Sequence, residues 1–122
     1  MSECTQFEYI YITKNKKLIL AATLHYFLHL IFPVVIAFLF FRKDWKKVYL
    51  IFLSTMLVDL DHLIADPIFK ADRCSINFHP LHSHFAILVY FLMIFTRRPF
   101  KIVGYGLLFH MLTDFIDCLI QN

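Results

Sequence analysis

Histidine and aspartate are concentrated in and beside the apolar segments of this 122-residue sequence, where ionisable residues are least expected. All seven histidines and five aspartates lie there: His25, His29, Asp59, Asp61, His62, Asp66, His79, His82, His84, His110, Asp114 and Asp117. Ionisable groups at membrane depth are costly, and they usually mark functional sites. Mixed imidazole and carboxylate ligands suit zinc, iron or manganese. The residue types therefore predict a divalent-metal site, with zinc as the first expectation and iron or manganese as alternatives.

Within each segment these residues recur three, four or seven positions apart, a spacing that places them on one face of a helix. The sets are His25 and His29, then Asp59 and His62, then His110, Asp114 and Asp117. Asp61 lies about 200° from Asp59 on an ideal helix. It would join the site only if the helix unwinds there, and otherwise it would cap the helix or support the ligands from behind.

The negative charge of this cluster also has to be compensated. It contains up to five carboxylates and no Lys or Arg, so burial would have to protonate most of the aspartates or supply a cation. A divalent metal ion supplies that charge, and four helices that point His and Asp inward form the metal sites of helix bundles. More than six candidate ligands are present, which is enough for one or two ions.

Roles can be assigned to these residues as expectations. The expected metal ligands are His25, Asp59, His62, His82, His110 and Asp114. The expected catalytic residues are His84 and Asp61, as a general base or as support, and the expected supporting residues are His29, His79 and Asp117. Lys70 and Arg73, in the link over the cluster, are expected to bind the anionic part of the substrate.

Each motif has a plainer interpretation when it is considered alone. His25 and His29 could be hydrogen-bonded histidines at a helix interface, residues 59–62 a capped helix end, and residues 79–84 a solvated loop. Asp114 is harder to explain in this way, because it lies in an otherwise apolar helix. The common level of all four motifs is what favours a metal site.

The composition indicates what must position these residues. The chain is 60% hydrophobic, 18% aromatic and only 17% charged, against roughly 45 to 50% apolar and about 25% charged in soluble domains. Four apolar runs, at about 18–41, 48–65, 81–96 and 102–120, exclude all twelve Lys and Arg. We expect one all-α integral membrane domain, 18–122, with four transmembrane helices, preceded by a tail or interfacial element over 1–17. The alternative is a soluble protein with four buried helices.

The four polar sets fall on one side of this predicted bundle. The first and third links carry seven basic residues, against five for the N-terminus, the second link and the C-terminus. The positive-inside rule therefore places the site on the non-cytoplasmic side, although Lys14, Lys16 and Lys17 before the first span oppose this orientation.

The three cysteines, Cys4, Cys74 and Cys118, lie on the site side. An odd number gives no complete pairing, and a bridge between Cys74 and Cys118 is possible only where that side is oxidising. Unpaired thiols are the simpler expectation, with Cys74 as a metal ligand a minor option.

The pattern resembles the membrane-bound, metal-dependent hydrolase family, whose best-known bacterial branch is the LexA-regulated inner-membrane hydrolases. The resemblance covers about 25–117 and rests on His25, the Asp-Leu-Asp-His of 59–62, a His-Ser pair at 82–83 after His79, and His110 with Asp114. It implies a compact helical fold in a bacterial inner membrane and a metal-dependent hydrolase. The family more often shows a longer spacing than that between His79 and His82, with a basic residue after the first His. From this departure we expect a distinct small subfamily.

The first functional expectation is therefore a hydrolase of a lipid or lipid-linked ester, with a phosphoester preferred, since a bound metal lowers the pKa of water and polarises a phosphoryl oxygen. The only glutamates, Glu3 and Glu8, lie far from the site, which excludes an HExxH metalloprotease. The alternatives are a di-iron lipid hydroxylase or desaturase, and a non-enzymatic haem- or metal-binding membrane protein. The expected partner is a membrane lipid. A net charge of +3 is too small to indicate nucleic acid, and nothing indicates an oligomeric state.

Overall fold

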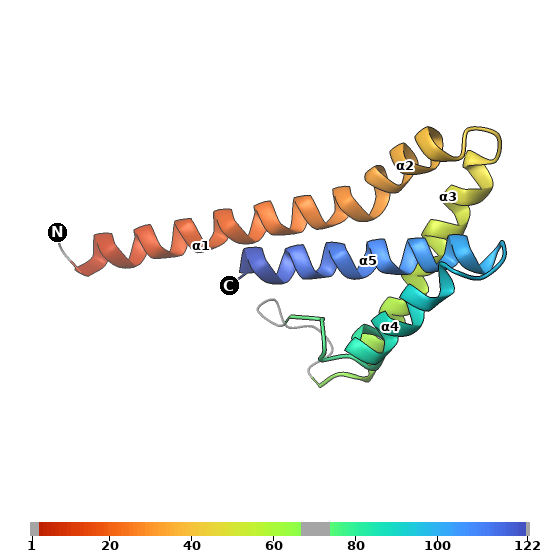
Figure 1. The fold of residues 1–122 in the computed structure, drawn as a ribbon. Helices are drawn as coiled ribbons and strands as arrows, with labels where there is room; N and C mark the ends of the chain where they lie inside the picture. Colours follow the sequence, from red (N-terminus) through yellow and green to blue (C-terminus); the bar gives the residue numbers. More distant parts are fainter. Residues whose placement is uncertain (1–2, 67–73, 122) are drawn as a thin grey trace.

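Helices form all of the regular structure in residues 3–66 and 74–121, which are the residues that the computed structural model describes (Figure 1). The expectation of an all-α chain is therefore confirmed for these residues. In order, the elements are α1 (Glu3–Tyr26), the π-helical turn η1 (Phe27–Ile31), α2 (Phe32–Phe40), α3 (Trp45–Ser54), the 3₁₀ helix η2 (Thr55–Ile64), the 3₁₀ turn η3 (Pro80–His82), α4 (His84–Met93) and α5 (Phe100–Gln121).

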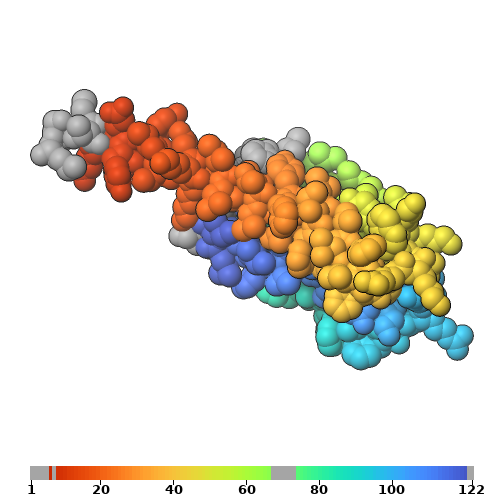
Figure 2. Space-filling model, turned by 90° about the horizontal axis from the view of Figure 1, so that it is seen from above, coloured from red at the N-terminus to blue at the C-terminus, as the bar shows by residue number. Residues whose placement is uncertain are grey.

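The first helix runs from α1 through η1 into α2 and bends at the π turn, where Figure 1 shows its change of direction. The N–H of Phe32 donates to the carbonyl of Phe27, five residues back. Pro33 has no N–H, so the carbonyl of His29 cannot receive the usual helical hydrogen bond. The described part of the expected N-terminal tail is helical and continues into residue 18 without a break. Figure 2 shows the first turns of α1 extending beyond the rest of the molecule.

Helix α3 runs back along α2, and the helix becomes more tightly wound in η2. Ala37 of α2, Val48 and Phe52 of α3, and Ile102 of α5 form one buried apolar cluster. From Thr55 the helix continues as ten residues of 3₁₀ helix, whereas such runs longer than about three or four residues are uncommon. This segment carries the Asp-Leu-Asp-His motif, so the motif does not lie on an ordinary α-helix.

The last two helices cross closely because a glycine lies at their contact. A Cβ atom at Gly104 of α5 would lie 2.9 Å from the Cβ of Met93 and 3.0 Å from the carbonyl oxygen of Tyr90 in α4. At the start of α4, the Ser83 Oγ accepts a hydrogen bond from the N–H of Ala86 at 3.2 Å and caps the helix. α5 packs against the long N-terminal helix, α3 and α4 (Figure 1).

Two helices are long and apolar enough to cross a membrane, Glu8–Phe40 and Phe100–Ile120. The first of these helices contains nearly all of the predicted span 18–41, and the second contains the predicted span 102–120. The second predicted span corresponds to α3 and η2, and the third contains η3 and α4. With ten residues, α4 is only about 15 Å long, compared with a hydrocarbon core of about 30 Å.

A disulfide joins Cys74, just before η3, to Cys118 near the end of α5, with the Cα atoms 5.0 Å apart. The expectation of unpaired thiols was therefore wrong, and Cys74 is not available as a metal ligand. This bridge is the alternative that the sequence left open, and the sequence could not decide for it because the two cysteines are 44 residues apart and meet only in the folded chain.

Candidate metal centre

Four side chains from three separate elements converge in the interior. Asp59 comes from η2, His82 from η3, and His110 and Asp114 from α5. Asp59 Oδ1 lies 3.0 Å from His110 Nε2 and 3.4 Å from His82 Nε2. Asp114 Oδ2 lies 2.9 Å from His82 Nε2 and 3.4 Å from His110 Nε2. These four residues, called the central group below, therefore form a ring of alternating oxygen and nitrogen atoms.

The spacing of this ring is close to that of a metal coordination sphere. Zinc bonds of about 2.0 to 2.2 Å place the ligand atoms of a tetrahedron roughly 3.3 to 3.6 Å apart. The four measured edges, between 2.9 and 3.4 Å, are close to this range. The central group therefore could hold a metal ion after only small movements of its side chains.

Two of these atoms are buried without a hydrogen-bond partner in the described structure, His82 Nε2 and Asp114 Oδ2. They lie 2.9 Å apart, but they are not aligned for a hydrogen bond with each other. His82, His110 and Asp114 are at most 4% exposed. Because an unsatisfied buried polar group costs about 1 to 3 kcal/mol, a cation between these atoms would satisfy both.

Asp61 holds His82 in the orientation that the central group needs. Its Oδ2 accepts hydrogen bonds from His82 Nδ1 at 3.1 Å and from the N–H of Leu81 at 2.9 Å. Because His82 Nδ1 donates to Asp61, the Nε2 lone pair is left to face the central group, which is the usual arrangement of a metal-binding histidine. Asp59 and Asp61 therefore contact opposite edges of one imidazole, and Asp61 takes the supporting position behind the ligands.

A second group, His25, His29 and Asp114, lies beside the first and shares Asp114 with it. Buried His29 comes from the π turn η1, and its Nε2 lies 3.4 Å from Asp114 Oδ1. The rings of His25 and His29 are 4.3 Å apart, and Asp117 Oδ2 lies 3.7 Å from His25 Nδ1. His25, expected as a ligand with Asp59, therefore belongs to this neighbouring group.

A third group consists of Asp61, His62 and His79. His62 Nδ1 lies 3.1 Å from Asp61 Oδ1, its ring stacks on His79 with centroids 3.9 Å apart, and its Nε2 is hydrogen-bonded to Ser75 Oγ. His62, the sixth expected ligand, thus lies at the edge of the central group and faces the third group. Each of the three groups could hold a metal ion.

The remaining expected residues lie elsewhere. His84, the first residue of α4, is exposed and belongs to none of the three groups. Lys70 and Arg73 lie outside the described residues, so their expected contact with the substrate stays a prediction.

Tyr90 is a supporting residue that sequence reasoning missed. Its hydroxyl donates to the carbonyl of Leu81 at 2.9 Å and so anchors the 3₁₀ turn that carries His82. A tyrosine that is buried within an apolar helix needs a partner for its hydroxyl, and this apolar context was the available signal. The signal does not identify the partner, which lies nine positions away in the sequence.

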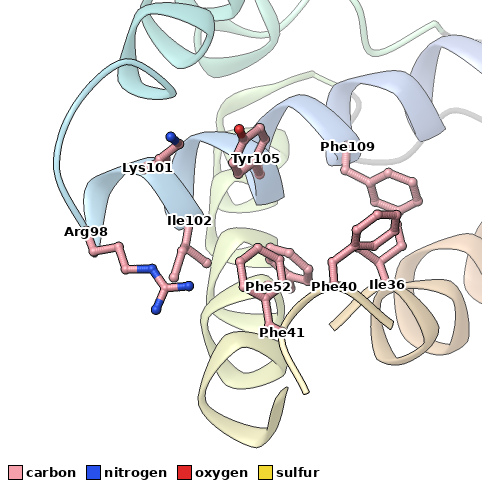
Figure 3. A pocket seen from close by; sticks show the side chains of 9 residues that line it. All are labelled: Ile36, Phe40, Phe41, Phe52, Arg98, Lys101, Ile102, Tyr105 and Phe109. Atoms are coloured by element: carbon pink, nitrogen blue, oxygen red, sulfur yellow. The ribbon is translucent and has the colours of Figure 1, made fainter. Parts of the chain in front are cut away.

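An apolar groove of about 610 Å³ runs beside the centre, between α2, α3 and α5 (Figure 3). Phe109 lines one end, and Arg98 and Lys101 lie at the other. Phe52 and Phe109 also line a small void that His29 and His110 border. The groove therefore ends one side-chain layer away from the central group.

Comparison with known proteins places the chain in a family. No curated protein and no solved structure matches it. A family model described as "Family of unknown function (DUF6122)" matches residues 19–121, which include all three His and Asp groups. The chain therefore belongs to the DUF6122 family.

Proposed function

We propose that this chain is a membrane-embedded, metal-dependent hydrolase that acts on a lipid or lipid-linked phosphoester. The observation that carries the proposal is the central group, in which two buried, unpartnered atoms, His82 Nε2 and Asp114 Oδ2, face each other at 2.9 Å. Two imidazoles and two carboxylates are ligands that zinc accepts, and a water molecule on the exposed Asp59 side would be the fifth ligand of a catalytic zinc. Zinc is the ion that we propose for this group.

The exposed apolar surface supports a position within the bilayer. Large apolar side chains are exposed on every long helix, including Phe40 at 76%, Ile64 at 79% and Phe85 at 76%. Soluble monomers rarely expose contiguous apolar patches of more than a few hundred Å². We therefore propose that the long N-terminal helix, α3 with η2, α4, and α5 form a four-helix membrane bundle with these side chains in contact with lipid.

Two independent features support placing the site on the non-cytoplasmic side of a bacterial inner membrane. The links on the opposite side carry more basic residues, as the positive-inside rule requires. The Cys74–Cys118 disulfide lies on the site side, and disulfides persist in oxidising compartments such as the periplasm.

The exposure of the central group indicates how substrate and water reach it. The Asp59 side chain is 38% exposed, whereas those of His82, His110 and Asp114 are almost completely buried. His62, 30% exposed, lies 3.7 Å from Asp59 Oδ1 at this opening. When bound, the metal would lower the pKa of a water molecule and polarise the phosphoryl oxygen. In this proposal Asp59 orients that water and its partly exposed carboxylate accepts the proton, while His62 Nδ1 donates to the backbone carbonyl of Asp59 at 3.1 Å and so supports it.

The groove supports a lipid as the substrate class. Its lining is aromatic and aliphatic over most of its length. Phe109, at one end of the groove, directly precedes His110 of the central group in the sequence. An acyl or prenyl chain could lie in this groove while its ester group reaches the central group. The same residues that carry the resemblance to membrane-bound hydrolases, 59–62 with His82, His110 and Asp114, supply the centre and its support.

The test combines metal content with activity. Protein purified in detergent without chelator should contain zinc by mass spectrometry, whereas Asp59→Ala and His110→Ala should lose most of it. Asp44→Ala, an exposed aspartate at the opposite end of the bundle, is the matched control and should keep it. Phosphatidic acid and polyprenyl diphosphate in mixed micelles are suitable first substrates, with phosphate release as the readout.

Three results would contradict the proposal. Wild-type protein without bound metal would exclude a metal enzyme, and unchanged metal content in both variants would exclude the central group as its site. Iron with oxygen-dependent lipid oxidation would favour the hydroxylase alternative over the hydrolase.

A further inference from the structure

The carboxylate of Asp114 faces two histidine sets with its two oxygens. Oδ2 points into the central group, 2.9 Å from His82 Nε2, and Oδ1 lies 3.4 Å from His29 Nε2 on the other side. We propose that Asp114 bridges two metal ions, one in the central group and a second held by His25 and His29. This inference rests on the proposed function, because it presupposes the ion in the central group.

The second position has the geometry of a ligand set. Single ligand atoms of His25, His29 and Asp114 all lie within 4.8 Å of one another, and His25 Nδ1 is buried without a hydrogen-bond partner in the described structure. The His29 ring is 4.4 Å from that of His110, so the two sets are directly adjacent. Carboxylate-bridged ions in two-metal enzymes are about 3.5 to 4 Å apart, a separation that such neighbouring sets can provide.

The π turn explains how His29 reaches Asp114. One extra residue in a helix rotates the residues before it by about 100° relative to the residues after it. Pro33 and Ala37, after the turn, are buried, and Ala37 packs with the α3 residues Val48 and Phe52. His29, within the turn, faces α5 instead. π turns are rare and frequently lie at functional sites, and this one directs a histidine to the free edge of a ligand carboxylate.

The charges of the described residues also favour two ions. Every ion-pair partner that the described structure gives Asp59, Asp61 and Asp114 is a histidine. Asp117, whose Oδ2 lies 3.7 Å from His25 Nδ1, adds a fourth carboxylate beside the second set. With neutral histidines, one divalent ion leaves two of these four negative charges uncompensated, whereas two ions give neutrality, which a low-dielectric site requires.

Two ions would also define the reaction more closely. In two-metal sites the ions stabilise both the attacking and the leaving oxygen of an in-line displacement at phosphorus. The bond that breaks is the P–O bond to the leaving group, and the bond that forms joins phosphorus to the oxygen of water, whose proton passes to the partly exposed carboxylate of Asp59. A two-metal site of this kind therefore suits a phosphoester substrate.

Metal stoichiometry tests this proposal separately from the first. Wild-type protein reconstituted with Mn²⁺ should bind two ions per chain and show the exchange-coupled electron paramagnetic resonance spectrum of a Mn²⁺ pair. The double variant His25→Ala/His29→Ala should bind one ion and show an isolated Mn²⁺ spectrum. Asp44→Ala, as the control, should behave like wild type.

The outcomes are distinguishable. One ion per wild-type chain, with an isolated spectrum at saturating Mn²⁺, would refute the second site and leave the proposed function intact. No bound ion, with Zn²⁺ as well as with Mn²⁺, would refute both. Because the wild-type spectrum alone decides between one ion and a coupled pair, the test does not depend on the double variant folding correctly.

Discussion

Asp61 gives the sharpest test of how the centre is built, because the structure assigns it a positioning role without direct participation. Its Oδ2 accepts one hydrogen bond from His82 Nδ1 and one from the N–H of Leu81. In Asp61→Ala both donors lose their acceptor, so His82 can rotate or shift its proton to Nε2, the atom that faces the central group. Metal affinity should fall, although all four residues of the central group remain.

The magnitude follows from the geometry. Loss of an outer partner of a metal-binding histidine weakens binding by about 10- to 100-fold, or about 1.4 to 2.7 kcal/mol. Asp61 makes two hydrogen bonds and is buried, so we expect the upper part of this range. Asp61→Asn keeps one oxygen acceptor and should lose roughly tenfold or less. Asp59→Ala removes a ligand atom and should lose more than Asp61→Ala.

The assay is competition for Zn²⁺ against a chromophoric chelator in detergent, with Asp44→Ala as the control. Thermal unfolding in excess chelator measures stability without metal. A structural role alone would lower the unfolding temperature of Asp61→Ala and leave its zinc affinity near that of wild type. That result, or equal affinity losses in Asp61→Asn and Asp61→Ala, would refute the positioning role.

Three further predictions concern the scaffold and the groove. Cys118→Ser opens the disulfide, which closes a 44-residue separation, and should cost up to about 4 kcal/mol, seen as a lower unfolding temperature that reductant no longer changes. Gly104→Ala places a Cβ 2.9 Å from that of Met93 and should destabilise the α4–α5 contact by about 1 to 3 kcal/mol in the same assay. Ile36→Trp narrows the groove and should raise KM for long-chain lipids more than for short-chain analogues. Equal effects on both would show that the groove does not hold the chain.

The sequence predicts the helical class well because the apolar runs are strong and exclude every basic residue. It does not predict the π turn or the ten-residue 3₁₀ helix. Both depend on tertiary context, since the local sequence around Pro33 allows an ordinary proline kink as readily as a π turn. The third span was expected as one helix over 81–96, whereas the chain forms a 3₁₀ turn, a Ser83 cap and then α4.

The two irregular helices also explain where the expected ligands lie. Spacing rules for an α-helix place Asp59 and His62 on one face about 4.5 Å apart along the axis. In a 3₁₀ helix the same three residues advance about 6 Å. His62 is thereby moved beyond the central group toward His79 and Ser75. Asp59, His82, His110 and Asp114 converge because α5 and the short η3 turn place them at one level.

The roles of the two aspartates in the Asp-Leu-Asp motif depend on the geometry of the 3₁₀ helix. With three residues per turn, Asp59 and Asp61 lie about 120° apart around the axis. They can therefore approach His82 from two sides, at 3.4 Å from its Nε2 and 3.1 Å from its Nδ1. The Asp59 carboxylate supplies negative charge to the central group, and the Asp61 carboxylate holds the proton of the His82 imidazole on Nδ1. The two aspartates are chemically identical in sequence, but the 3₁₀ helix gives them roles that cannot be exchanged.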